Sequence, residues 1–146
     1  RQMCIRDRDI RCFLYGDYGM ESYANGIAVS PAFLKKHPEA IRGFIRATYK
    51  AARETVLNPK LAVSSAKKFQ PLVDDAVEAD RLRLGVDCCI LTPYVKKHGY
   101  GDVDMARLQR SIEQAALAYG LKNIPKAEDM FDRSYLPPKS ERFIHK

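Results

Sequence analysis

Apolar side chains recur every three or four residues over one long stretch of the chain, residues 38–57. The recurring positions are Ile41, Phe44, Ile45, Thr48, Ala52 and Val56. This spacing puts them on one face of an amphipathic helix, with arginine and lysine side chains on the adjacent face. We predict that the helix ends at Asn58 and Pro59, because a proline inside a helix costs about 3 kcal/mol.

Capping residues and prolines predict further helices on both sides of this one. Ser30 and Pro31 begin a helix of one or two turns, and Asp104 caps a longer helix that ends at Gly120, with Leu121 folding back. Further helices are predicted over residues 59–69 and 71–90, after Thr92 and Pro93, and around Met130 and Phe131.

Two short apolar runs near the beginning of the chain predict β-strands, at Ile10–Gly16 and Ile27–Val29. The polar, glycine-containing stretch between them is interpreted as a connection. Nearly everything after them is amphipathic helix, and two short strands offer too little sheet for so many helices to cover. We therefore expect an α/β fold that is helix-rich in this part, and a fragment of a larger protein.

The chain of 146 residues carries a net charge of +7 and has a sequence pI near 9.3. Such a charge attracts nucleic acid or anionic lipid if the cations converge on one surface. The lysines instead form separate pairs at residues 35–36, 67–68 and 96–97, which we interpret as cations near helix C-termini. A basic nucleic-acid-binding helical domain is a minor alternative, since zinc, RNP-like and arginine-rich motifs are absent.

The spacing of the cysteines does not indicate whether the protein resides in an oxidising or a reducing compartment. The cysteines are Cys4, Cys12, Cys88 and Cys89, which form neither a CxxC pair nor a disulfide scaffold. We interpret Cys88 and Cys89 as small apolar residues on a buried helix face, with a strained vicinal disulfide as the alternative.

No catalytic motif is recognisable in the sequence. The histidines, His37, His98 and His145, lie far apart, and neither HExxH nor GxSxG is present. The acidic residues of stretch 74–80 are followed by arginines and are interpreted as a solvated helix face. The sequence therefore predicts a protein that is not an enzyme and has no metal site and no cofactor.

A candidate ligand-binding stretch lies just before the second predicted strand. Asn25 and Gly26 offer backbone amides on a permissive backbone, and Tyr18 and Tyr23 bring aromatic rings and hydroxyls to the same region. Such groups can hold a small polar ligand by stacking and hydrogen bonding. The alternative is a turn with two tyrosines at the edge of the core.

The order of several motifs resembles one family of transport proteins. The motifs are Tyr23, Asn25 and Gly26, the triplet His37, Pro38 and Glu39, then Phe44, Ile45 and Ala47, and the helix end at Asn58 and Pro59. In this order they resemble the C-terminal half of solute-binding proteins of ABC importers, in the group that handles nitrate, sulfonate, taurine and thiamine-pyrimidine precursors. The resemblance covers about residues 9–138.

The resemblance implies a type II periplasmic binding protein, in which two α/β lobes enclose a solute in the cleft between them. It divides the chain into a non-native or disordered leader at residues 1–8, the end of the second lobe at 9–22, a hinge crossing strand at 23–30, the C-terminal helices of the first lobe at 31–138, and a disordered tail at 139–146.

The function implied is that of a monomeric substrate-binding component without chemistry of its own. It would capture a small polar solute in the periplasm, free or anchored to the membrane, and deliver it to an ABC permease of the inner membrane. Tyr23 and Asn25 would face the ligand at the hinge, Gly26 would permit close approach, and Tyr18 would form a wall. The alternative is a pyrimidine-precursor biosynthetic enzyme of the same fold, whose cysteine-rich motif is absent here.

Overall fold

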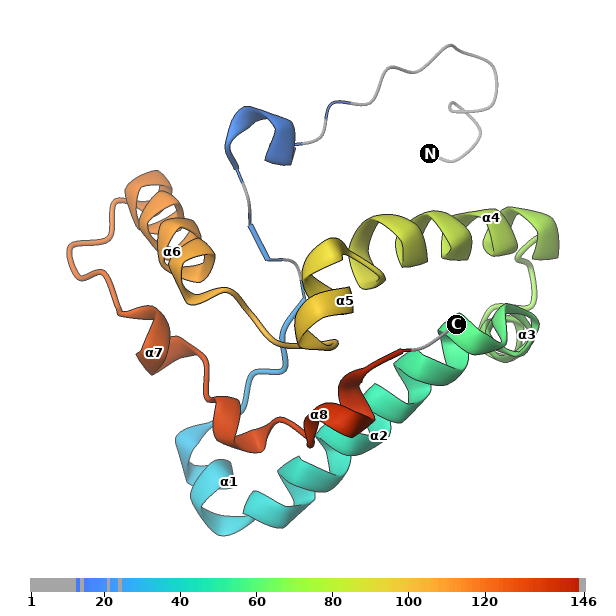
Figure 1. Cartoon of the computed structure of the whole chain (residues 1–146), viewed down its shortest axis with the longest axis horizontal. Helices are drawn as coiled ribbons and strands as arrows, with labels where there is room; N and C mark the ends of the chain where they lie inside the picture. The colour runs from blue at the N-terminus through green and yellow to red at the C-terminus, as the bar shows by residue number, and fades with distance from the viewer. Residues whose placement is uncertain (1–12, 14, 21, 24, 145–146) are drawn as a thin grey trace. The chain divides into compact units, whose positions relative to one another are not determined.

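The computed structural model describes residues 13, 15–20, 22, 23 and 25–144 (Figure 1). The predicted leader at 1–8 and most of the predicted strand Ile10–Gly16 lie outside these residues. The chain divides into two compact units: the first is Arg1–Ile27 with Val103–Phe131, and the second is Ala28–Asp102 with Asp132–Lys146. The first boundary, after Ile27, falls inside the predicted hinge crossing.

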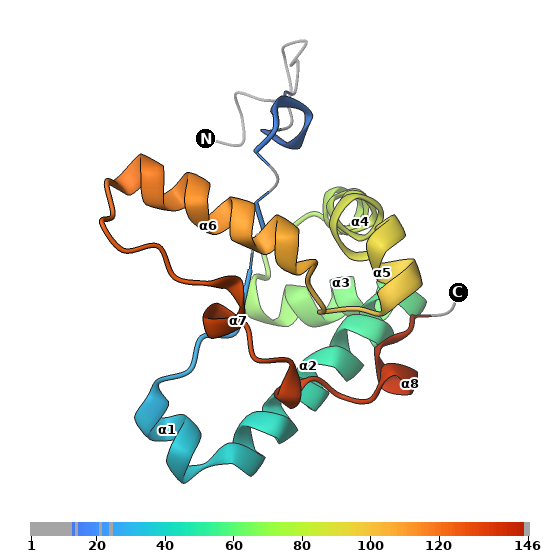
Figure 2. The ribbon, with the colours of Figure 1, turned by 60° about the vertical axis from the view of Figure 1, so that its left-hand side comes forward.

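The second unit is built from helices joined by short turns (Figures 1 and 2). Its elements are α1 (Pro31–Lys36), α2 (Pro38–Leu57), α3 (Pro59–Phe69), α4 (Asp75–Gly85), the π-helix η2 (Val86–Ile90), α5 (Pro93–His98), the 3₁₀-helix η3 (Arg133–Tyr135) and α8 (Lys139–Arg142). Among its pairs of elements, α3 packs against both α2 and α4, while α8 and η3 both contact α2.

The predicted starts of α1, α3 and α5 are confirmed. The side-chain oxygens of Ser30, Asn58 and Thr92 accept backbone N–H groups of α1, α3 and α5, each at 3.3 Å, and a proline follows each cap. A cap of this kind stabilises a helix by about 1 kcal/mol. The lysine pairs lie in the last turns of α1, α3 and α5, as interpreted from the sequence.

The core of the second unit lies along α2. Ile41, Ile45 and Tyr49 are buried there. Partly buried residues pack against them from four other segments: Val29, Leu34, Tyr100, Tyr135 and Leu136. Phe44, expected on the apolar face, is instead 60% exposed. The buried stripe runs through Tyr49, one turn after Ile45, and Phe44 lies about 100° away from it around the helix.

The helix predicted over residues 71–90 begins later and changes character near its end. Asp74 caps α4 by accepting the backbone N–H groups of Ala76 and Val77 at 2.9 and 3.0 Å. After Gly85 the helix widens into η2, where the Leu91 N–H donates to Val86 five residues earlier. Cys88 and Cys89 of η2 are free and exposed, so their interpretation as fillers of a buried helix face is wrong.

The first unit contains the 3₁₀-helix η1 (Tyr15–Tyr18), α6 (Met105–Tyr119) and α7 (Ala127–Met130). The predicted termini of α6 are confirmed: the Asp104 carboxylate accepts the Arg107 N–H at 2.7 Å, and Gly120 takes φ +63°. The Leu121 N–H then donates back to Ala116 at 2.9 Å, which closes the helix end.

Two predictions from the sequence fail in the described residues. Ile27–Val29 forms no strand, and the described part of the chain contains none, so the α/β class is not visible there. A strand needs a neighbour to complete its hydrogen bonds, and these residues offer no such edge. The tail, expected to be disordered, forms α8 at residues 139–142, and Glu141 accepts two hydrogen bonds from Arg46 at 2.6 and 2.8 Å.

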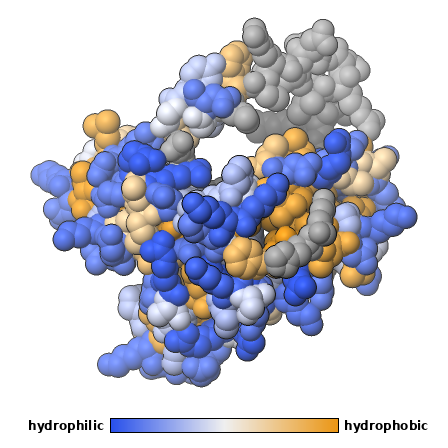
Figure 3. Space-filling view, in the orientation of Figure 1, coloured by the Kyte–Doolittle hydropathy of each residue, from blue (hydrophilic) through white to orange (hydrophobic). Residues whose placement is uncertain are grey.

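Many large apolar side chains reach the surface, where they alternate with charged residues (Figure 3). The most exposed are Leu72, Phe69, Leu117 and Tyr119, each more than 80% accessible. Among the described helices, none combines the length and the apolar character that a membrane span requires.

Candidate functional site

The predicted ligand-binding stretch begins with a tight turn in the first unit. Residues Tyr15–Tyr18 form η1, and the Met20 N–H donates to the Tyr15 carbonyl at 3.0 Å. Gly19 closes this turn with φ +84°, a conformation that favours glycine. Tyr18 is left 71% exposed, with its ring centroid 6.2 Å from that of Phe13. Its ring is therefore available for stacking.

Helix α6 holds this stretch at two backbone oxygens. The Gln114 side-chain amide donates to the Gly19 carbonyl at 2.9 Å, and Arg107 donates to the Ser22 carbonyl at 3.4 Å. Both donors come from α6, about two turns apart. The segment around the predicted site is thus fixed by residues more than 80 positions later in the sequence.

Tyr23 makes the most specific contact between the stretch and α6. Its hydroxyl oxygen accepts the backbone N–H of Asp104 at 2.8 Å, and the Arg107 guanidinium lies 4.5 Å from the centre of its ring. A cation over an aromatic face is attracted by the ring quadrupole. Tyr23 is therefore half-buried and engaged, and it positions the N-terminus of α6.

Replacing Tyr23 by phenylalanine removes the acceptor of the Asp104 N–H and keeps the ring under Arg107. We expect the opening free energy of the first turn of α6 to fall by about 1 kcal/mol. Amide hydrogen exchange at Asp104 measures this change. Tyr18→Phe is the matched control, since Tyr18 is exposed and should leave the exchange unaltered; equal protection in Y23F and the native chain would contradict the assignment.

Asn25 and Gly26 follow Tyr23 in the chain, and both are exposed. Within the described residues, no hydrogen bond of the Asn25 side chain is found. Gly26 does not use a positive φ, and a methyl group built on it meets nothing within 4 Å. The space beside Gly26 is open, as close approach of a ligand requires.

The structure thus brings Tyr23 together with Asp104 and Arg107, and leaves Tyr18, Asn25 and Gly26 facing solvent. Sequence reasoning recognised Asp104 only as a helix cap and missed Arg107. The one sequence signal for Arg107 is its place in the first turn after that cap. No three His, Cys, Asp or Glu side chains of the described ranges lie close enough to hold a metal ion.

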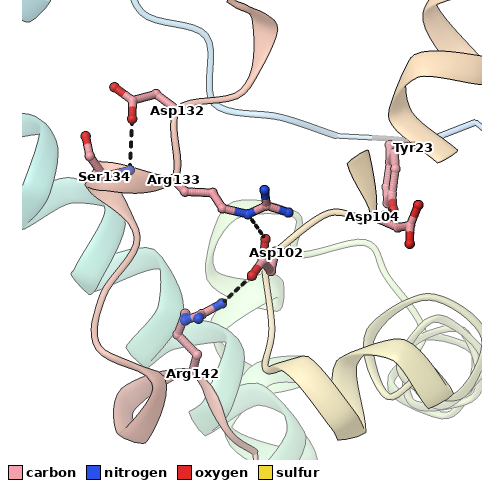
Figure 4. A network of polar contacts seen from close by, with 7 residues as sticks. All are labelled: Tyr23, Asp102, Asp104, Asp132, Arg133, Ser134 and Arg142. Atoms are coloured by element: carbon pink, nitrogen blue, oxygen red, sulfur yellow. Dashed lines mark hydrogen bonds and ion pairs between the residues drawn. The ribbon is translucent and has the colours of Figure 1, made fainter. Parts of the chain in front are cut away.

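A second polar cluster lies within the second unit (Figure 4). Asp102 accepts from Arg133 Nε at 2.8 Å through one carboxylate oxygen, and its other oxygen lies 3.4 Å from Arg142 Nη1. The hydrogen bond to Asp102 raises the pKa of Arg133. Ser134 lowers the pKa of Asp132 by hydrogen bonding, first through its side chain and then through its backbone. These contacts connect the loop after α5 to the C-terminal segment, and we assign them a structural role.

Tyr49 of α2 lies next to this cluster. Burial raises its pKa to about 12, and its ring meets that of Tyr100 edge-on at 5.3 Å. Gly101, with φ +78°, passes so close that a side chain there would overlap the Tyr49 hydroxyl. The absence of a side chain at Gly101 therefore serves the packing of Tyr49.

Comparisons with known proteins agree with the motif order found in the sequence. A family model described as NMT1/THI5 like matches residues 2–62, which include Tyr18, Tyr23, Asn25 and Gly26. The riboflavin-binding protein RibY of Chloroflexus aurantiacus is 42% identical over 48 residues, which are 33% of this chain and 14% of that protein. No solved structure matches the chain. These matches confirm the resemblance to a substrate-binding protein family, and residues 2–62 are the part of the chain that is similar to the NMT1/THI5-like family model.

Proposed function

We propose that this chain is part of a solute-binding protein and that its residues 18–26 contact the solute. The observation that carries the proposal is that the family match covers a stretch which α6 holds in place while Tyr18, Asn25 and Gly26 remain exposed. This combination favours binding, because a backbone that is already fixed loses less entropy when the ligand binds.

The exposed groups favour a planar, polar heteroaromatic solute. Tyr18 offers a ring face for stacking, and the Asn25 amide offers a donor and an acceptor at the same time. A flavin or a pyrimidine presents both an aromatic ring face and hydrogen-bonding edges, whereas nitrate and taurine contain no aromatic ring. The name of RibY, a riboflavin-binding protein, supports testing riboflavin first and a thiamine-pyrimidine precursor second.

The wider proposal is a two-lobed α/β binding protein of the periplasm, monomeric, that delivers its solute to an ABC permease. The division of the chain after Ile27, inside the predicted crossing at residues 23–30, supports a hinge there. The family match supports the transport role.

Asn25→Ala is expected to weaken solute binding about fivefold, because losing the hydrogen bonds of this amide costs about 1 kcal/mol. Quenching of flavin fluorescence during titration with the protein measures riboflavin affinity, and calorimetry measures the pyrimidine precursor. Asn123→Ala, an exposed asparagine of the same unit, is the matched control.

An unchanged affinity in N25A would remove Asn25 from the site. Absence of binding by the native chain to either compound would contradict the solute class. Consumption of the pyrimidine precursor, rather than reversible binding, would replace the transport proposal by the biosynthetic enzyme of the same fold.

A further inference from the structure

A groove of about 580 Å³ runs between α3 and α4 in the second unit, whereas the proposed solute-binding residues belong to the first unit. Val63 of α3 is its buried part, with 9% of its surface exposed, and Pro59 and Ala79 add apolar atoms on either side. Apolar and charged side chains lie side by side over this region of the surface (Figure 3). An apolar floor of this size can accept side chains of a partner.

The rim of the groove is positively charged. Three lysines and one aspartate line it, which leaves two more positive than negative charges. Lys67 is paired with Asp75 at 2.7 Å, a bond that joins α3 to α4. For Lys60 and Lys68, no ion pair with any described residue is found. The two lysines therefore face the groove without a carboxylate partner in the described chain.

The spacing of these two lysines indicates the shape of the partner. Lys68 is eight positions after Lys60 on α3, so the two residues lie about 12 Å apart along the helix axis, a little more than two helical turns. A single small anion would meet one of them, and a flat lipid surface would not enter the groove. A helix with carboxylates two turns apart and apolar side chains between them matches both lysines and the floor around Val63.

We infer that the α3–α4 groove is a docking site for an acidic amphipathic helix of a partner protein. Lys60 and Lys68 pair with carboxylates at the two ends of the contact, and leucine-like side chains cover Val63 between them. The charge difference fixes the partner's sign, since a basic helix would meet two like charges. The site is independent of the solute-binding residues and does not rest on the proposed function.

A charge exchange tests this inference. The probe is a fluorescein-labelled helical peptide of about 16 residues, long enough to form a helix, with leucines on one face and glutamates two turns apart. Its twin carries lysines at the glutamate positions. We expect Lys60→Glu with Lys68→Glu to weaken binding of the acidic peptide about tenfold in fluorescence anisotropy and to strengthen binding of the basic twin.

The matched control is Lys35→Glu with Lys36→Glu on α1, which changes the net charge equally at another exposed lysine pair. Circular dichroism verifies that both double variants are folded. An equal loss in both variants would show that the net charge alone attracts the peptide and would overturn the inference. So would absence of binding to the native chain, or binding to phosphatidylglycerol vesicles that K60E/K68E abolishes and the acidic peptide does not displace.

Discussion

Replacing Asp102 by asparagine is expected to lower the free energy of unfolding by about 3 kcal/mol, measured by urea denaturation followed by circular dichroism. Its side chain is 14% exposed and meets two guanidinium groups, from Arg133 and Arg142. Arg142 is 5% exposed, so loss of the carboxylate leaves a buried cation without its neutralising partner. The cost of an unpaired buried charge exceeds that of an exposed one several-fold.

Asp80→Asn is the control, because Asp80 also pairs with an arginine but is 78% exposed. We expect its unfolding free energy to stay within about 0.5 kcal/mol of the native value. If D102N and D80N changed stability equally, the buried position of Arg142 would have no energetic consequence and the structural role assigned to the cluster would be wrong.

Helix boundaries were predictable because the signals are local. Ser30 with Pro31, Asn58 with Pro59, and Gly120 act through atoms within four residues of themselves, and the observed helices begin or end there. The π-helix after Gly85 carries no such local signal. Sequence therefore predicted where most helices lie.

Burial was less predictable because it depends on elements distant in sequence. Phe44 and Tyr49 both fit a helical apolar pattern loosely. Tyr49 is the one that is buried, because Tyr100, Tyr135 and Leu136 pack on its side of α2. The α8 helix was missed for the same reason: its contacts are with Arg46 and Asp102, and the local sequence alone is polar.

The candidate site was predictable as a stretch but not as a set of contacts. Tyr23, Asn25 and Gly26 were selected by residue type and motif order, whereas the partner of the Tyr23 hydroxyl lies 81 residues later. The predicted strand Ile27–Val29 illustrates the limit of such reasoning, because a strand exists only with a neighbour beside it.

Replacing Gly101 by alanine is expected to destabilise the chain by about 3 kcal/mol, through two separate costs. The backbone at Gly101 has φ +78°, which disfavours any residue with a Cβ. The added methyl group also overlaps the hydroxyl and ring of Tyr49. Tyr49 is 7% exposed and packed against Tyr100, so it cannot turn away without opening the core along α2.

Two other glycines separate these costs in the same urea denaturation experiment. Gly120 has φ +63° and open space around it, so Gly120→Ala should cost only the backbone term, about 1 kcal/mol. Gly43 lies inside α2 with open space and an ordinary φ, so Gly43→Ala should stabilise the chain by about 0.5–1 kcal/mol. The excess of G101A over G120A measures the overlap with Tyr49. Equal losses in the two variants would mean that Tyr49 yields freely, which contradicts a close-packed core at this point.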